Sequence, residues 1–232
     1  MKKIPYILML LTLLVNSSCN CEKNNNQAII KVENGQFIKN DKPYYFLGTN
    51  FWYGAILASQ GEGGNRERLH RELDYLKSIG VTNLRVLVGA EGKEGWESKI
   101  NPILQTSPGV YNDELLDGLD YFMYQLQERD MNAVLYLSNS WEWSGGFTQY
   151  LMWTGELDED FTPEISWGDF RAAATKFVRS DSAKQLLNNH IKFIVSRTNR
   201  YTNQKYVDDP ALFSWQLCNE PRAFSQESKE YL

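Results

Sequence analysis

The residues best suited to chemistry lie near the carboxyl end of the sequence, in the stretch FSWQLCNEPRAF. An apolar run ends there on Asn219, Glu220 and Pro221. A carboxyl group at the end of such a run is expected to be partly buried, which favours its protonated form and lets it donate a proton to a leaving oxygen. Asn219 beside it can hydrogen-bond a substrate hydroxyl. A second interpretation stays open, in which Glu220 only caps the next helix.

A second charged residue, Arg85, interrupts the strand-like run NLRVLV. An arginine inside a buried strand is expected to be paired with carboxylates. Arg85 therefore either holds a catalytic carboxylate in its ionised form or belongs to a structural ion pair, and the sequence leaves both interpretations open.

Aromatic residues make up 13% of the sequence, which includes seven Trp. Trp141, Trp143, Tyr150 and Trp153 crowd one segment, NSWEWSGGFTQYLMW, directly after a strand-like run. So many exposed rings are unfavourable in water unless they pack or bind something. Such rings can stack on the C–H faces of sugars. The segment is expected to divide its rings between a sugar-stacking wall and a small cluster of its own, with Trp141 nearest the site.

The elements that position these residues alternate between strands and helices. Short strands come first, around turns at Asn34–Gly35 and Asn40–Asp41. Leucines at helical spacing then predict helices over 65–80, 113–129 and 181–199. Between them lie the apolar runs VTNLRVLV, NAVLYLSNS and ALFSWQLCNE. A long loop is predicted from residue 141 to about residue 175.

Continuously apolar strands that alternate with helices predict a parallel sheet covered by helices. The sheet is either open and doubly wound or closed into a barrel. No glycine-rich phosphate loop follows the first strand, which disfavours the open dinucleotide-binding form. In barrels the active site is built from the carboxyl ends of the strands, and polar and aromatic residues gather at those ends in this sequence: Asn50, Trp52, Tyr53, Glu91, Asn139, Trp141, Glu142, Asn219 and Glu220.

We therefore predict an α/β chain of the (β/α)8 TIM-barrel family. A full barrel has eight strands and typically about 250 residues, whereas this sequence of 232 residues holds four core strands. It is expected to be about the first four β/α units of a truncated barrel. Such a half barrel leaves two strand edges unpaired and is not expected to be stable alone.

The amino terminus resembles a targeting segment. A basic start, MKK, precedes the apolar run IPYILMLLTLLV. We predict a signal peptide over 1–18, a lipid attachment site at Cys19, a flexible tether over 19–28 and a catalytic region over 29–232. Simple secretion with cleavage nearby is the alternative to lipidation. The expected location is outside the cell, either secreted or as an outer-surface lipoprotein of a bacterium.

The sequence suggests neither a cofactor nor a metal site. Cys21 lies in the tether and Cys218 within an apolar strand, so no disulfide framework follows. The two histidines, His70 and His190, both fall on predicted helices. The net charge of −5 argues against a nucleic-acid partner.

Several stretches together resemble glycoside hydrolase family 5, in clan A, and look most like its endo-β-1,4-mannanase subfamily. They are FLGTNFWY, NLRVLV, VLYLSNSWEWSGGFTQYLMW and NNHIKFIVSRTNRYTNQKYVDDPALFSWQLCNEPRAF. The resemblance covers roughly residues 29 to 232. The Asn-Glu-Pro end is shared by many retaining glycosidases, and the other motifs are more specific to mannanases.

The resemblance implies a (β/α)8 barrel that hydrolyses β-1,4-mannosidic bonds of mannans with retention and without a cofactor. By motif, Glu220 matches the general acid/base and Asn219 the neighbouring substrate-binding amide. Arg85 matches the arginine that supports the nucleophile. Trp141 matches a subsite aromatic, and Trp52 is expected to be another.

The second carboxylate is the missing part of this pattern. Retaining glycosidases need two carboxylates about 5–5.5 Å apart, and in this family the nucleophile comes from the seventh strand. Only Glu227 and Glu230 follow Glu220, while Glu91 and Glu142 belong to other strands. The nucleophile is therefore expected to be absent from this chain, and the fragment alone is expected to be inactive.

Three functions remain open at this point. The first is a mannan endo-1,4-β-mannosidase that acts on β-mannan or a related plant polysaccharide. The second is a cellulase-like β-1,4-glucanase of the same family. The third is a surface lipoprotein that binds glycan without hydrolysing it.

Overall fold

The computed structural model describes residues 28–93, 100–158 and 166–231. The predicted signal peptide, nearly all of the predicted tether, and with them Cys19 and Cys21, lie outside the described residues. Within the described part of the chain, no helix combines the length and apolarity that crossing a membrane requires.

A parallel sheet of four strands forms the centre of the fold, as predicted. The strands lie side by side in chain order, and they are β4 (Leu47–Asn50), β5 (Val81–Leu87), β8 (Asn132–Tyr136) and β9 (Leu212–Gln216). The register places Arg85 of β5 between Asn50 and Val134, and Val134 opposite Ser214. The carboxyl ends of all four strands therefore lie at the same end of the sheet.

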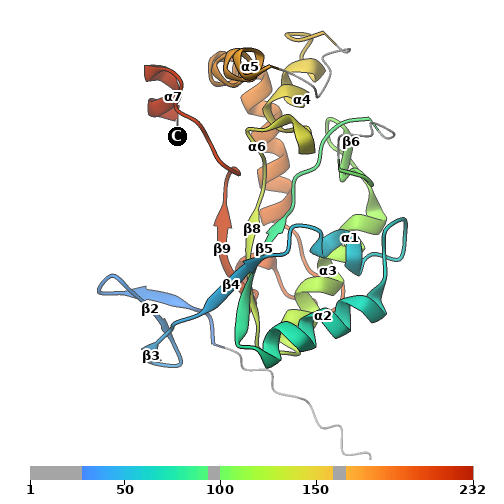
Figure 1. Ribbon diagram of the computed structural model, residues 1–232, viewed down its shortest axis with the longest axis vertical. Coiled ribbons are helices and arrows are strands. Elements are labelled where there is room, and N and C mark those ends of the chain that lie inside the picture. The colour runs from blue at the N-terminus through green and yellow to red at the C-terminus, as the bar shows by residue number, and fades with distance from the viewer. Residues whose placement is uncertain (1–27, 94–99, 159–165, 232) are drawn as a thin grey trace, which may run out of the picture.

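Helices connect these strands. The β4–β5 link contains α1 (Gly54–Ala58) and α2 (Arg66–Ser78). The β5–β8 link contains the hairpin of β6 (Gln105–Ser107) and β7 (Val110–Tyr111), then α3 (Asp113–Gln127). The β8–β9 link contains the 3-10 turn η1 (Glu142–Ser144), α4 (Gly146–Trp153), α5 (Trp167–Arg179), α6 (Asp181–Val195) and the 3-10 turn η2 (Tyr206–Asp208). After β9 comes α7 (Gln226–Tyr231). Figure 1 shows α1, α2 and α3 beside the sheet, and α4 and α5 beyond the carboxyl ends of β8 and β9.

A small antiparallel sheet precedes the parallel one, at its amino end (Figure 1). It consists of β1 (Lys31–Glu33), β2 (Gln36–Lys39) and β3 (Lys42–Pro43). Its turns lie where they were predicted, and all four turn residues have positive φ, as tight hairpins of this kind require. Its aromatic rings reach β9, where Phe37 packs against Phe213 with the two ring centroids 4.8 Å apart.

The main apolar core lies between the sheet and the helices. Leu69 and Leu73 of α2 and Phe122 of α3 are fully buried there against Leu84 and Leu135 of the central strands. The edge strands differ from the central ones, because β4 is exposed along its length and β9 is half-buried. Leu47 on β4 is 63% exposed, so both edges of the described sheet carry accessible apolar surface, as the half-barrel prediction requires.

The prediction of a long loop from residue 141 to residue 175 was wrong, since this segment contains α4 and most of α5. Ser166 and Asp169 form a capping box at the start of α5. Phe170, Ala173, Ala174 and Phe177 make a buried apolar stripe at helical spacing. Ala173, Ala174 and Phe177 pack on Phe147 and its neighbours in a second, smaller core. The Ser-x-x-Asp spacing and this stripe were the signals that could have revealed the helix.

The two longer predicted helices end earlier than expected. The predicted 113–129 helix stops at Gln127 and the 181–199 helix at Val195. Asn199 lies in a turn instead, because its side chain donates to the carbonyl of Asp120 and accepts from the backbone N–H of Tyr201. Such local side-chain bonds compete with helix continuation.

Helix α1 approaches α3 at Gly118. A Cβ atom at this position would lie 2.2 Å from the carbonyl oxygen of Ala55 and 2.8 Å from the backbone nitrogen of Ser59. Only glycine permits this contact between the two backbones, which brings the segment after β4 against α3.

We expect Gly118→Ala to lower the free energy of unfolding by about 1–3 kcal/mol, because overpacking outweighs the gain in helix propensity. Gly168→Ala in α5 is the matched control, since its Cβ would meet nothing closer than 3.5 Å. Urea unfolding of both variants and the wild type, each as the full-length protein, measures the difference. Equal stability of Gly118→Ala and wild type would contradict the close packing.

Candidate active site

A cavity of about 410 Å³ opens at the end of the parallel sheet where the carboxyl ends of its strands lie. All four strands or the segments that follow them contribute to it. Its lining residues are Asn50, Trp52, Arg85, Ile100, Tyr136, Trp143, Asn219 and Glu220. Four of the five residues predicted for the site are among them, and the fifth, Trp141, hydrogen-bonds Glu220. Among these lining residues, Glu220 supplies the one carboxylate.

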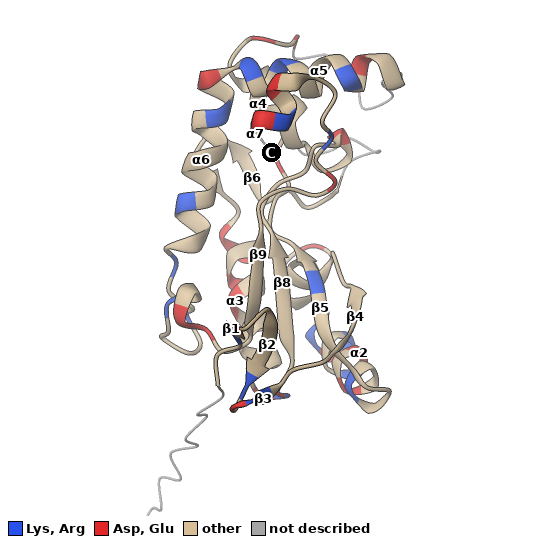
Figure 2. Ribbon diagram, turned by 90° about the vertical axis from the view of Figure 1, so that its left-hand side faces the viewer, with Lys and Arg blue, Asp and Glu red and all other residues tan. Residues whose placement is uncertain are grey.

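Arg85 is the one charged residue in the four strands of the parallel sheet. Figure 2 shows that charge otherwise lies on the helices, the connecting segments and the small antiparallel sheet. The guanidinium donates from Nη2 to Asn219 Oδ1 at 2.8 Å and from Nε to Gln216 Oε1 at 2.8 Å. It also lies 4.0 Å from the centre of the Tyr136 ring, and burial raises the pKa of this tyrosine to about 12.

The expectation that carboxylates pair with Arg85 is therefore wrong within the described residues, because its acceptors are amide oxygens. The physical reason is its location. Arg85 is half-buried and faces the open cavity, so neutral acceptors, an aromatic face and solvent suffice to hold the cation. Its charge remains available to attract an anion that enters or borders the cavity.

Asn219 is held on both sides of its amide. Its oxygen accepts from Arg85, and its Nδ2 donates to Asn139 Oδ1 at 3.0 Å. Asn139 in turn accepts from the backbone N–H of Trp141 at 3.1 Å and donates to Ser144 Oγ at 3.0 Å. This chain fixes the orientation of Asn219, which is only 7% exposed. The sequence had placed Asn139 at a strand end without giving it a role.

Glu220 is more exposed than the sequence suggested. Its side chain is 56% accessible, so the expectation of partial burial is wrong. The reason is that β9 ends at Gln216 and the chain has left the sheet before Glu220, which adopts a left-handed conformation with φ of 44°. The helix-cap alternative also fails, since Ser225 Oγ accepts the N–H of Ser228 at the start of α7.

The aromatic segment divides its rings as anticipated. Trp143 lines the cavity, and the indole N–H of Trp141 donates to Glu220 Oε2 at 2.9 Å. Tyr150 is fully buried and packs edge-to-face with Trp153 at 5.5 Å. The packed part of the prediction is confirmed, whereas contact with sugar stays a prediction.

Glu91 anchors this segment. It is 1% exposed, and it accepts from Tyr150 Oη at 3.0 Å and from the backbone N–H of Gly146 at 3.1 Å. Gly146 has φ of 55°, and a Cβ on it would lie 2.3 Å from the carbonyl oxygen of Asn139. Glu91 and Gly146 therefore set the path of the loop that carries Trp141 and Trp143. Neither Glu91 nor Glu142 lines the cavity.

His190 of α6 joins the ends of two strands. Its Nε2 lies 3.1 Å from the carbonyl oxygen of Val88 and 3.0 Å from that of Leu137, and its Nδ1 lies 3.3 Å from Tyr111 Oη. Nε2 therefore carries the proton and donates to the residues that follow β5 and β8. Burial lowers the pKa of His190 to about 4. His70, on α2 as predicted, contacts Tyr121 Oη and Arg129.

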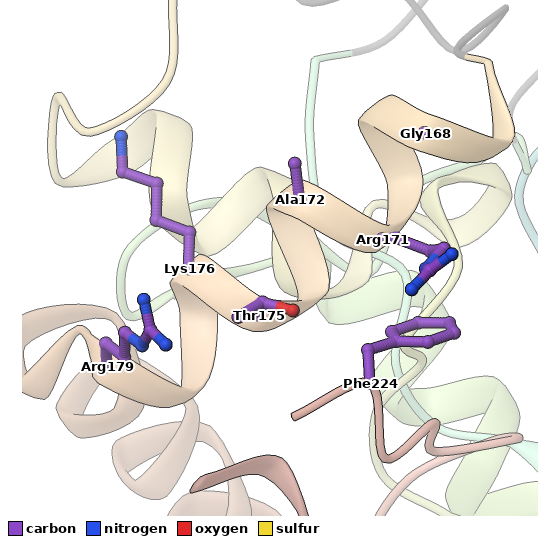
Figure 3. Close-up of a pocket in the computed structure, with 7 residues that line it drawn as sticks. All are labelled: Gly168, Arg171, Ala172, Thr175, Lys176, Arg179 and Phe224. Atoms are coloured by element: carbon purple, nitrogen blue, oxygen red, sulfur yellow. The ribbon is translucent and has the colours of Figure 1, made fainter. Parts of the chain in front are cut away.

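A larger hollow of about 500 Å³ lies along α5, away from these residues. Figure 3 shows Arg171, Lys176 and Arg179 along this helix, with Phe224 facing Arg171. It contains none of the groups described above. The smaller cavity at the strand ends is the candidate active site because the carboxylate, the amide and the arginine converge there.

Comparisons with known proteins agree with this geometry. A family model described as GH family 5 beta-mannosidase-like matches residues 27–231. A putative mannan endo-1,4-beta-mannosidase 4 of Arabidopsis thaliana is 28% identical over 232 residues, which are 100% of this chain and 52% of the relative. Mannan endo-1,4-beta-mannosidase 4 of Oryza sativa subsp. japonica is 34% identical over 199 residues, 85% of this chain and 39% of the relative.

Solved structures show the same likeness. A glycoside hydrolase family 5 mannosidase from Rhizomucor miehei is 33% identical with a TM-score of 0.78, over 84% of this chain and 49% of that one. An endo-1,4-beta-mannanase from the same organism is 26% identical with a TM-score of 0.60, over 86% and 51%. These are (β/α)8 barrels, and the fold described above corresponds to a part of one. The chain spans about half the length of the first curated relatives it matches.

We expect acid to weaken the protein through His190. Its pKa is 6.5 when free and about 4 when folded, so the unfolded chain takes up the proton first as the pH falls. The stability contributed by the neutral imidazole is complete above pH 6.5 and is lost as the pH falls toward 4, by about 3 kcal/mol.

The measurement is urea unfolding of the full-length wild type and His190→Gln from pH 7 to pH 4. Glutamine can still donate to the two carbonyls but does not titrate. The stability difference between the two proteins should shrink by about 3 kcal/mol over this range. A difference that is independent of pH would contradict the neutral, buried imidazole.

Proposed function

The chain belongs to glycoside hydrolase family 5, and from this premise we propose that it is part of an endo-acting retaining hydrolase that cleaves β-1,4-mannosidic bonds in mannans. The observation that carries the proposal is the convergence of Glu220, Asn219 and Arg85 on one cavity at the carboxyl ends of parallel strands. The names of the curated relatives support the choice of mannan as substrate.

In this proposal Glu220 acts twice. As a carboxylic acid it protonates the glycosidic oxygen while the leaving sugar departs and a covalent glycosyl-enzyme forms. As a carboxylate it then takes a proton from the water that hydrolyses this intermediate. Asn219, held by Arg85 and Asn139, presents its remaining amide hydrogen to a hydroxyl of the bound sugar. Trp52 and Trp143 offer ring faces within the same cavity.

We propose that the nucleophile comes from a part of the protein outside these 232 residues. Among the residues that the structure describes around the cavity, Glu220 is the only carboxylate. Arg85 has neutral acceptors, so its positive charge can keep an incoming carboxylate ionised. Relatives that are about twice as long as the matched region have room for such a residue.

A second candidate is an exo-acting β-mannosidase. The TM-score is 0.78 with a solved mannosidase and 0.60 with a solved endo-mannanase. Another structure of that mannosidase, a mutant, was determined in complex with mannosyl-fructose. Product analysis separates the two candidates, because an endo-enzyme releases a range of oligosaccharides from linear mannan and an exo-enzyme releases mannose from the start. β-Glucan as substrate tests the glucanase alternative in the same assay.

We expect Glu220→Gln in the full-length protein to lower kcat on mannan by about 10²–10⁴-fold, because general acid–base catalysis contributes that much. Binding of manno-oligosaccharides should persist, since the amide has the same shape. The matched control is Glu227→Gln, at an exposed residue of α7 that pairs with Arg179. Reducing-sugar release and calorimetric binding measure the two properties.

Unimpaired hydrolysis by Glu220→Gln would refute the acid/base role of Glu220. Binding of mannan by a wild type that never cleaves it would favour the glycan-binding alternative.

We also propose that the protein is exported and anchored by lipid on Cys19. The basic start, the apolar run and the cysteine after small residues support this. Expressed in a bacterial host, the wild type should partition into the detergent phase of a Triton X-114 extraction, and Cys19→Ala should move to the aqueous phase. Cys21→Ala is the matched control and should partition like the wild type. Detergent partitioning of Cys19→Ala would rule out this anchor.

A further inference from the structure

We propose that Trp141 is a positioning residue for the Glu220 carboxyl group, and that sugar stacking is left to Trp143 and Trp52. This inference rests on the proposed function. It changes the role that the family resemblance suggests for Trp141, which is that of a subsite aromatic. The argument starts from the surroundings of the indole ring.

The ring of Trp141 is packed against protein. Phe170 of α5 stacks on it with centroids 4.2 Å apart and planes 6° from parallel. Trp167 leans against it at 5.9 Å, and the guanidinium of Arg222 lies 5.7 Å from its centre. A sugar needs an open ring face, and Phe170 occupies one face of this indole. Trp141 is also not among the residues that line the cavity, whereas Trp143 and Trp52 are.

The polar edge of the same ring is directed at the carboxyl group. Indole Nε1–H is a donor only, and it lies 2.9 Å from Glu220 Oε2. A donor at Oε2 leaves Oε1 to carry the transferable proton. The hydrogen bond therefore selects which oxygen of Glu220 serves as acid, and it restrains rotation of a side chain that is otherwise 56% exposed.

The backbones of the two residues are also joined. Ser140, next to Trp141, donates from Oγ to the carbonyl oxygen of Glu220 at 2.7 Å. One residue earlier, Asn139 and Asn219 form a parallel bridge beyond the ends of β8 and β9. The loop after β8 is thus fixed to the segment after β9, so the indole and the carboxyl group keep one relative position.

Arg222 is the other group near this oxygen. Its Nη2 lies 3.5 Å from Glu220 Oε2, and its side chain is 46% exposed. An exposed ion pair at this distance is weak and screened by salt. The hydrogen bond from the stacked indole is shorter, and the ring that makes it is held by Phe170. Positioning is therefore assigned to Trp141.

The test compares two leaving groups in the full-length protein. Hydrolysis of a manno-oligosaccharide needs a proton from Glu220, whereas departure of 2,4-dinitrophenolate does not. Trp141→Phe keeps the stacked ring and removes the N–H. We expect kcat/KM for the oligosaccharide to fall about ten- to hundredfold, the usual effect of losing one hydrogen bond to a charged group, because Glu220 becomes a carboxylate as its proton is transferred. For the dinitrophenyl β-mannoside, kcat/KM should stay within about threefold of wild type.

Trp143→Phe is the comparison for a stacking residue, and it should raise KM for both substrates alike. Phe170→Leu is a second probe, because it loosens the support of the indole without touching the hydrogen bond. It should lower kcat/KM for the oligosaccharide relative to kcat/KM for the dinitrophenyl β-mannoside, as Trp141→Phe does, but by a smaller factor. Circular dichroism of each variant verifies that it is folded.

The outcomes separate this inference from the proposed function. An equal loss on both substrates in Trp141→Phe, or no loss on either, would overturn the positioning role while leaving the hydrolase intact. A wild type that cleaves neither substrate would overturn the proposed function, and this inference with it. A selective loss on the oligosaccharide in both Trp141→Phe and Phe170→Leu supports positioning.

Discussion

The hydrogen bond between Arg85 and Asn219 is the contact on which the candidate site depends. It joins β5 to the segment after β9 across the intervening strand β8. Asn139, which follows β8, completes the connection by accepting from Asn219. Three chain segments that are far apart in the sequence are thereby held in one register at their carboxyl ends. Trp141 is bonded to this network through Asn139, and Glu220 directly follows Asn219 in the chain.

The same network explains why a charged residue is tolerated in an apolar sheet. A buried cation is normally retained with a carboxylate partner, yet Arg85 has amide acceptors and the face of Tyr136. Neutral acceptors hold the guanidinium in place without cancelling its charge. In the proposed mechanism this arrangement leaves the charge of Arg85 available to keep a second carboxylate ionised, whereas an internal ion pair would have neutralised it.

Much of the fold could be predicted from the sequence, because periodic patterns of apolar residues indicate its strands and helices. The apolar runs around Arg85 and before Asn219 gave the parallel strands, and leucine spacing gave the helices that cover them. The segment from residue 141 to residue 175 was misread because its Trp and Gly residues resemble a loop. Its helical signal lies in the short stripe around Phe170 and in the cap at Ser166, which outweigh that composition.

The site was predictable in its membership and not in its geometry. Glu220 was identified by its place after a strand, since strand ends converge in any parallel sheet, and Arg85 was identified as a charge inside an apolar strand. Exposure of Glu220 depends on its left-handed backbone and on where β9 stops. The acceptors of Arg85 depend on the register between β5 and β9. Both are properties of tertiary structure, for which a pattern along one chain carries no signal.

Two apolar cores support the two groups that matter in the proposed mechanism, the Arg85 guanidinium and the Glu220 carboxyl group. The main core, between the sheet and α2 and α3, fixes Arg85 and Asn219 through the strands. The smaller core contains residues of α4, α5 and α6. Phe170 stacks on the indole that contacts Glu220, and its ring also contacts Phe224, which packs against this core. In the proposed mechanism the charge of Arg85 steadies a nucleophile and the indole of Trp141 orients the acid. The cores behind these two groups are coupled, because Ile191 packs against both of them and Cys218 of the smaller core directly precedes Asn219.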